Sequence, residues 1–203
     1  MTTDIIKFLN DEFQIDDKAY RLSMSAEEQV SEILNEINKV RELNQLKVIK
    51  AMQKNKLSDS HFGGTTGYGY GDNGRDTLDR VYADIFKAES ALVRHNIVSG
   101  THALALCLYG NLRPGDELLS ITGKPYDTLE EVIGIRGTNG GSLKEFGITY
   151  RQVDLDENGN IDFEAVKNAI SGRTKMVLIQ RSRGYSWRKS LLISDIEKAV
   201  DYV

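Results

Sequence analysis

The chain has 203 residues, of which 40% are hydrophobic and 28% charged, and its formal net charge at pH 7 is −4. These values are ordinary for a globular protein with the length of one domain, or one and a half, and Lys and Arg do not form the basic cluster that a nucleic-acid or anionic-membrane surface needs. The single cysteine, Cys107, excludes an internal disulfide, and no apolar run has membrane-spanning length, so we expect a cytoplasmic protein.

A single long helix is predicted over residues 25–56. Ser25 and Glu28 have the spacing of a capping box at its start. Apolar side chains then recur at three- and four-residue spacings, which is typical of an amphipathic helix. These residues are Val30, Ile33, Leu34, Ile37, Val40, Leu43, Leu46 and Ile49. Such a helix packs its apolar side on a core or on a partner. Because this helix makes up most of the chain before residue 60, residues 1–60 are predicted to form an N-terminal helical segment.

Residues 61–74 are rich in glycine, threonine and tyrosine. The stretch from Gly69 to Gly74 matches the G-x-G-x-x-G pattern, but the dinucleotide-binding fingerprint needs a strand immediately before it, and residues 58–64 do not have a strand pattern. A flexible linker is the other simple interpretation. Because flexible linkers favour serine over aromatic residues, Tyr68 and Tyr70 argue against it.

Helices and strands are predicted to alternate from residue 76 onward. Helices are expected at 76–89, from Thr101, and at 128–135, 162–170 and 193–203; strands at 91–93, 117–121, 148–153 and 175–179; and a loop at 137–141. This alternation predicts an α/β fold, a three-layer sandwich with a mostly parallel sheet. The last helix has no stop signal, so we expect the domain formed by residues 61–203 to be truncated.

The segment Ser99-Gly100-Thr101 opens the helix that follows residue 98. Ser99 or Thr101 can cap this helix, and Gly100 has no Cβ to keep a ligand away from the backbone. The first N–H groups of a helix lack internal partners and lie at the positive end of its dipole. The segment is therefore predicted to bind a phosphate group.

No metal site is predicted. Residues 154–161 resemble an EF-hand loop, but its twelfth position is Ala165 and no helix precedes it, so an Asn-Gly turn is the better interpretation. His61, His95 and His102 do not have metal-ligand spacing. His102, in the first turn of the predicted phosphate-binding helix, either packs there or faces a ligand.

Two further segments follow predicted strands, at the edge where α/β sheets bind ligands. Tyr126 follows the strand 117–121 and either contacts a ligand or only caps its loop. Arg181 and Arg183 follow the strand 175–179 and either bind a carboxylate through a bidentate fork or are solvated.

The sequence resembles the fold-type I pyridoxal-phosphate enzymes of cysteine and methionine metabolism, in the aluminium-resistance or methionine gamma-lyase-like branch. Residues 61–75, 99–106, 123–131 and 180–190 carry the match. The resemblance implies an aspartate aminotransferase-like large domain and a homodimer or homotetramer with shared sites. It also implies that residues 99–101 hold the cofactor phosphate and that Tyr126 stacks on the pyridine ring.

The remaining cofactor contacts implied by the resemblance come from two loops. Tyr70, with Tyr68 beside it, matches a Tyr-x-Arg loop that reaches the phosphate of a neighbouring subunit. Asp72 stands where the arginine of that pattern is expected, and Arg75 is the candidate substitute. Ser182, after the strand 175–179, completes the predicted cofactor-binding set.

The function implied is that of a carbon–sulfur lyase, which removes a sulfur group from an amino-acid substrate by β- or γ-elimination. In the family the Schiff-base lysine and the aspartate that pairs with the pyridine nitrogen follow further downstream, so we expect this chain to lack both. Two alternatives stay open: a non-catalytic fragment, and a nucleotide- or phosphate-binding module that uses the same helix N-terminus.

Overall fold

The computed structural model describes residues 2–137 and 140–203, so Thr138 and Asn139 of the predicted loop 137–141 lie outside the described residues. The chain divides into two compact units, Met1–Arg94 and His95–Val203. This division falls later than the predicted boundary after residue 60, because the segment after residue 60 packs on the long N-terminal helix. The assignment of domains stays a prediction.

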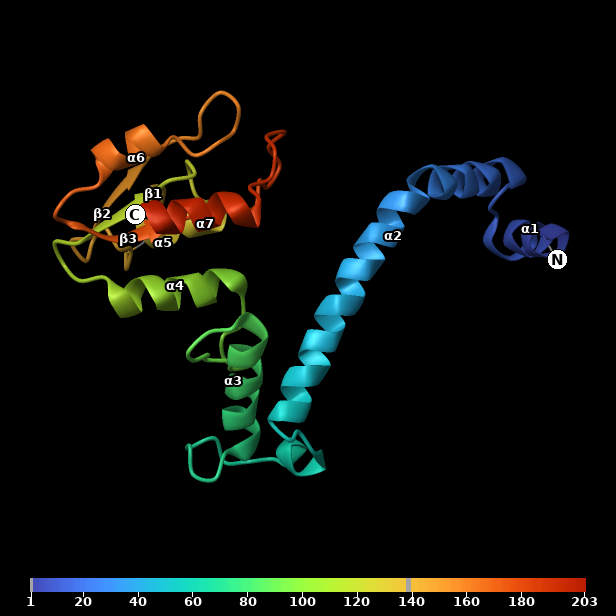
Figure 1. Ribbon diagram of the computed structural model, residues 1–203, viewed down its shortest axis with the longest axis horizontal. Helices are drawn as coiled ribbons and strands as arrows, with labels where there is room; N and C mark the ends of the chain where they lie inside the picture. Colours follow the sequence, from blue (N-terminus) through green and yellow to red (C-terminus); the bar gives the residue numbers. More distant parts are fainter. Residues whose placement is uncertain (1, 138–139) are drawn as a thin grey trace. The chain divides into compact units, whose positions relative to one another are not determined.

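The first unit is helical (Figure 1). It contains α1 (Thr2–Phe13), α2 (Asp17–Lys54), the short 3₁₀ helix η1 (Asp59–Phe62) and α3 (Asn73–Phe86). The predicted capping box at Ser25 is wrong: α2 begins earlier, where the Asp16 carboxylate accepts a hydrogen bond from the Ala19 N–H at 2.7 Å. None of the described helices is long and apolar enough to span a membrane.

α3 packs on the last turns of α2. Ala51 of α2 and Val81 of α3 are buried, and the Asn55 side-chain amide donates to the Asp84 carboxylate at 2.7 Å. The strand predicted at 91–93 is wrong, because this segment is irregular and pairs with none of the strands that the structure describes. It is fixed to α3 instead, since Asp79 accepts hydrogen bonds from the Val93 N–H and from Arg94, both at 2.7 Å.

The glycine-rich motif is a turn that leads into α3. Gly69 and Gly71 have φ angles of 83° and 69°, a region that glycine enters without strain. A Cβ at Gly74 would collide with the carbonyl of His61, so that position needs glycine for close backbone packing. The described residues before the motif form η1 and bends, with no strand, as the sequence indicated.

The second unit contains a parallel sheet of β1 (Glu117–Ser120), β2 (Thr149–Gln152) and β3 (Thr174–Leu178), in the order β2-β1-β3. Its helices are α4 (Gly100–Asn111), α5 (Asp127–Ile133), α6 (Phe163–Ala169) and α7 (Ile193–Tyr202). The strands and helices predicted after residue 98 are all present, with bounds shifted by a few residues. In Figure 1 the strands lie between α4 and α6.

The central strand buries its side chains on both faces of the sheet. Leu118 packs in one cluster with residues of α4 and α5, whereas Leu119 packs in a second cluster with residues of α6 and α7. Alternate residues of a strand point to opposite faces, so two adjacent leucines serve two helical layers. The predicted α/β class, with a parallel sheet between two helical layers, is confirmed.

The acidic segment after β2 is the predicted turn. The Asp156 carboxylate accepts hydrogen bonds from the N–H groups of Asn158 and Asn160, at 2.9 and 2.7 Å, and Gly159 has a φ of 74°. These bonds, above all that from Asn160, hold the pKa of Asp156 below its ordinary value. The carboxylate is therefore occupied by its own loop.

Candidate functional site: the N-terminus of α4

The site begins where the backbone enters α4. Ser99 is extended and caps the helix: its hydroxyl accepts a hydrogen bond from the His102 N–H at 3.1 Å, and its carbonyl accepts from the Ala103 N–H at 3.0 Å. The N–H groups of Gly100 and Thr101 have no acceptor among the residues that the structure describes. The cap thus leaves two donors free at the positive end of the helix dipole.

These donors are open to a ligand. Ser99 and Gly100 are exposed, and a Cβ placed at Gly100 would meet no heavy atom within 4 Å. An anion can therefore approach the backbone of this turn without displacing protein. That the segment binds a phosphate group stays a prediction.

Thr128 connects this turn to the loop that carries Tyr126. The hydroxyls of Thr101 and Thr128 form a hydrogen bond of 2.8 Å between α4 and α5. Tyr126 is the N-cap residue of α5, two positions before Thr128. The structure thus brings the segment 99–101 and the Tyr126 loop to the same edge of the sheet. Thr128 was not among the predicted site residues, although its place at the start of α5 was visible in the sequence.

Gln180 follows β3 and forms hydrogen bonds with the segment that follows β1. Its side-chain oxygen accepts the Tyr126 N–H at 2.7 Å, its own N–H donates to the Thr122 hydroxyl at 2.8 Å, and its side-chain nitrogen lies 3.4 Å from the Ser182 carbonyl. Tyr126 and Ser182 are therefore held by one side chain. The sequence placed Gln180 directly after a strand, but only the tertiary contacts reveal its bridging role.

The Tyr126 ring is partly open. It borders Gly184, where a Cβ would lie 3.7 Å from a ring carbon, and the residue is 43% exposed. A ring with this exposure at the carboxyl end of a parallel sheet can stack on a flat ligand.

The arginines after β3 hold their own loop together. Arg181 donates to the carbonyl of Leu191 at 2.9 Å, Arg183 to that of Arg188 at 3.2 Å, and Arg188 to that of Ser182 at 2.9 Å. The carboxylate-binding interpretation of Arg181 and Arg183 stays a prediction.

His102 contacts its own turn. Its Nδ1 lies 3.4 Å from the backbone nitrogen of Val98, which can donate to it. This contact favours the packing interpretation of His102 over the ligand-facing one. Within residues 2–137 and 140–203, no group of three or more potential metal ligands comes together.

The other predicted cofactor residues lie in the first unit. Tyr68 and Tyr70 are 84% and 89% exposed. The Arg75 guanidinium donates to the Gly67 carbonyl at 3.2 Å and pairs with the Asp72 carboxylate at 2.9 Å. In this structure Arg75 therefore orders the glycine-rich loop and presents the two tyrosines to solvent.

A pocket of about 390 Å³ lies beside this loop, between the end of α2, η1 and α3. Its lining is mainly apolar and includes Met52, Leu78 and Val81, with Asp72 and Arg75 at one side. The Asp72 Oδ1 also accepts from the Thr65 hydroxyl at 2.5 Å, whereas the buried Oδ2 lies 2.9 Å from the Arg75 guanidinium but accepts no hydrogen bond from the described residues. The pocket therefore combines apolar surface with a buried carboxylate oxygen that has an ion-pair contact but no hydrogen bond.

Comparison with known proteins decides the family. The family model described as methionine gamma-lyase matches residues 19–203, which is nearly the whole chain. The chain belongs to the methionine gamma-lyase family. The resemblance inferred from the glycine–tyrosine loop, the turn at Ser99 and the segment after β3 is thereby confirmed.

Three proteins are similar to this methionine gamma-lyase family member over most of its length. The YnbB protein of Bacillus subtilis is 52% identical over 184 residues, which are 90% of this chain and 44% of that protein. A crystal structure from Clostridium novyi, named a carbon-sulfur lyase involved in aluminum resistance, matches with a TM-score of 0.89 and 47% identity, over 97% of this chain and 47% of that one.

A second crystal structure, from Listeria innocua, is named a "putative cystathionine beta-lyase involved in aluminum resistance". It is 55% identical, with a TM-score of 0.85, and the match covers 90% of this chain and 45% of that one. The chain thus spans less than half the length of these relatives. The names of the two solved structures support a family of carbon–sulfur lyases.

Proposed function

We propose that the protein takes part in pyridoxal-phosphate-dependent carbon–sulfur bond cleavage in a sulfur-containing amino acid, by β- or γ-elimination. The observation that carries the proposal is the pair of open N–H groups at Gly100 and Thr101, next to a partly exposed aromatic ring at Tyr126. Membership of the methionine gamma-lyase family supports the same chemistry.

The residues at this edge of the sheet fit the cofactor. The segment 99–101 would hold the phosphate through two backbone donors and the helix dipole, and the Tyr126 ring would stack on the pyridine. Gln180 would hold Tyr126 in place through its backbone N–H. Bound pyridoxal phosphate supplies an electron sink for the substrate Cα.

The residues of the first unit would complete the cofactor site. Tyr68 and Tyr70, with Arg75 ordering their loop, are proposed to contact the phosphate in a neighbouring subunit, and Ser182 to contact the cofactor from the segment after β3. A site shared in this way requires a homodimer or homotetramer. The lone cysteine, Cys107, suits a reducing, cytoplasmic setting.

Two ligands test the phosphate contact. Pyridoxine 5′-phosphate has the ring and the phosphate of the cofactor but no aldehyde, so it cannot react with surface lysines. We expect equilibrium dialysis to show that it binds more tightly than pyridoxine. Equal binding of the two would contradict a phosphate contact at α4.

Turnover is tested separately. The protein, supplied with pyridoxal phosphate, is incubated with cystathionine or with methionine. β-Elimination from cystathionine releases pyruvate, ammonia and homocysteine, and γ-elimination from methionine releases 2-oxobutyrate, ammonia and methanethiol. Formation of either keto acid supports the lyase, and cofactor binding without turnover supports the alternative of a non-catalytic fragment.

A nucleotide- or phosphate-binding module is the second candidate, because a helix N-terminus recognises phosphate and not the group attached to it. Competition distinguishes the two. Displacement of pyridoxine 5′-phosphate by adenosine monophosphate at equal concentration would favour the nucleotide module. Retention of the pyridoxine compound would favour the cofactor.

A further inference from the structure

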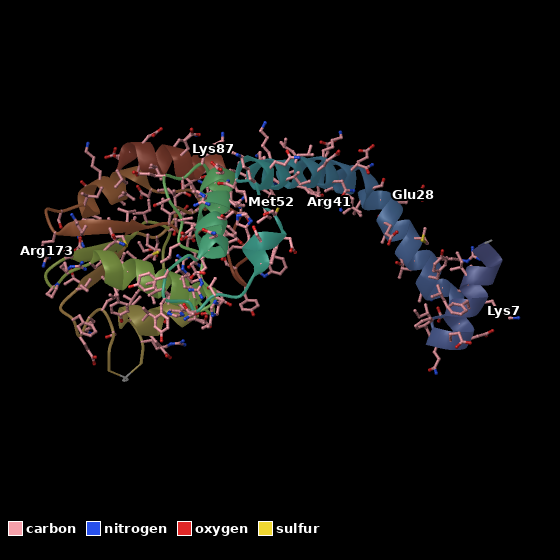
Figure 2. The ribbon with its side chains drawn as sticks, turned by 90° about the horizontal axis from the view of Figure 1, so that it is seen from below. Lys7, Glu28, Arg41, Met52, Lys87 and Arg173 are labelled. Atoms are coloured by element: carbon pink, nitrogen blue, oxygen red, sulfur yellow. The ribbon has the colours of Figure 1, made fainter. Side chains whose placement is uncertain are left out.

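An apolar stripe runs along the middle of α2, upstream of the turns that pack on α3. Val30, Ile33, Ile37 and Val40 follow one another at spacings of three and four residues and so lie on one side of the helix. They are 42%, 63%, 56% and 60% exposed. Figure 2 shows this part of α2 between the labelled Glu28 and Met52, with Arg41 between them.

The stripe is narrower than the sequence suggested. Leu43, Leu46 and Ile49 follow at strict three-residue spacing, and each such step turns about 60° around a helix of 3.6 residues per turn. These three residues therefore lie progressively further around the helix from the side that carries Ile33 and Ile37. Only the stripe from Val30 to Val40 continues the side on which Ala51 is buried against α3.

The charges of α2 are divided between its two halves. Residues 26–37 contain four acidic side chains and no basic one, and residues 38–54 contain five basic side chains and one acidic. Two copies of this helix placed antiparallel bring each acidic half beside a basic half. Two parallel copies would place like charges together.

The positions of the apolar residues in the stripe also fit antiparallel pairing of two copies of α2. If Ile33 lies opposite Ile37 of a second copy, Val30 lies opposite Val40, and the same alignment places Glu27 beside Arg41 of that copy. A two-fold interface requires each contact to occur twice, and this alignment satisfies that condition. Neither Glu27 nor Arg41 has an ion-pair partner in the described part of the chain.

We propose that the Val30–Val40 stripe of α2 is an interface with a second copy of this chain, formed by antiparallel pairing of the two α2 helices and flanked by two Glu27–Arg41 ion pairs. The stripe excludes water at the centre of the interface, and the ion pairs set the direction of the helices. This interface does not rest on the cofactor proposal, because no residue of segment 99–101 takes part in it.

A charge swap tests the pairing. Sedimentation equilibrium on the whole chain measures the dimer dissociation constant. Arg41→Glu is expected to weaken the dimer about tenfold or more, because it replaces two attractive pairs by two repulsive ones. The double variant Glu27→Lys/Arg41→Glu is expected to restore the original constant. Lys50→Glu, an equal change of charge on the opposite side of α2, should leave it unchanged.

A second pair of variants tests the apolar stripe. Ile33→Ser should weaken the dimer, whereas Leu46→Ser, at similar exposure on another side of the helix, should not. All the substituted side chains are exposed, so circular dichroism should show unchanged helix content in each variant. A chain that stays monomeric at its highest soluble concentration, a dimer insensitive to Arg41→Glu or Ile33→Ser, or a double variant without recovery would overturn the proposal.

Discussion

Gly100→Asp is expected to separate phosphate binding from folding. A Cβ at this position meets open space, and Gly100 does not have a positive φ, so the backbone can accept the change. A carboxylate in the first turn of α4 interacts favourably with the helix dipole, by about 0.5 kcal/mol. The same carboxylate would occupy the place of the phosphate and repel it.

The size of the effect follows from Coulomb's law. Two unit charges 4 Å apart interact by about 1 kcal/mol in bulk water and by about 4 kcal/mol near a protein surface. The phosphate carries nearly two charges, and the turn is exposed, so a loss of about 2 kcal/mol is expected, which weakens binding about 30-fold.

The assay is equilibrium dialysis of pyridoxine 5′-phosphate, with thermal unfolding measured on the same samples. Gly110→Asp is the matched control: it is the same substitution in an equally open position near the other end of α4. It should leave binding unchanged. Equal weakening by Gly100→Asp and Gly110→Asp, or no weakening by either, would refute the assignment of the phosphate to this turn.

Three further changes test the fold that supports the site. Ser99→Ala removes the cap of α4, so unfolding in urea should show a loss of about 1 kcal/mol. Leu119→Ala leaves a cavity at a fully buried position between β1 and the α6–α7 layer, so the free energy of unfolding should fall by about 2–5 kcal/mol in the same measurement. A loss below about 1 kcal/mol would mean that the cluster rearranges to fill the space. Glu117 is buried and accepts two hydrogen bonds from Arg151, at 2.7 and 2.9 Å, which hold its pKa below the ordinary value. Folding lowers the pKa of Glu117, so the ionised carboxylate stabilises the folded chain fully above about pH 4.3, the pKa of glutamate in an unfolded chain. This stabilisation is lost as the pH falls through the pKa of Glu117 in the folded protein. Glu117→Gln should therefore cost about 2 kcal/mol at pH 7 and flatten the fall in stability at acid pH, and an unchanged pH profile would exclude this role.

Local patterns in the sequence were sufficient where short-range chemistry decides the structure. Ser99 caps α4 because its hydroxyl reaches an N–H three residues away, and this contact is the same in any protein. The alternation of apolar segments with helical ones predicted a sheet with two covered faces, and Leu118 and Leu119 indeed serve opposite layers.

The failures came where a distant contact overruled a local preference. Residues 91–93 have the composition of a strand. The Val93 N–H, however, donates a hydrogen bond to the Asp79 carboxylate, so it is not available to pair with a neighbouring strand. Ser25 and Glu28 have capping-box spacing, but Asp16 supplies a cap further upstream, and the helix runs through both residues.

By itself the sequence determined the class of the fold, the turn at Ser99 and the family, because all three are encoded in local spacing and in the identity of a few segments. Only the tertiary structure decided that Thr128 and Gln180 tie the segment 99–101 and Tyr126 to one edge of the sheet, and that Arg75 is occupied by Asp72. The physical reason is that a side-chain hydrogen bond depends on distance in space, and residues 54 positions apart, such as Tyr126 and Gln180, become neighbours only when the strands pair.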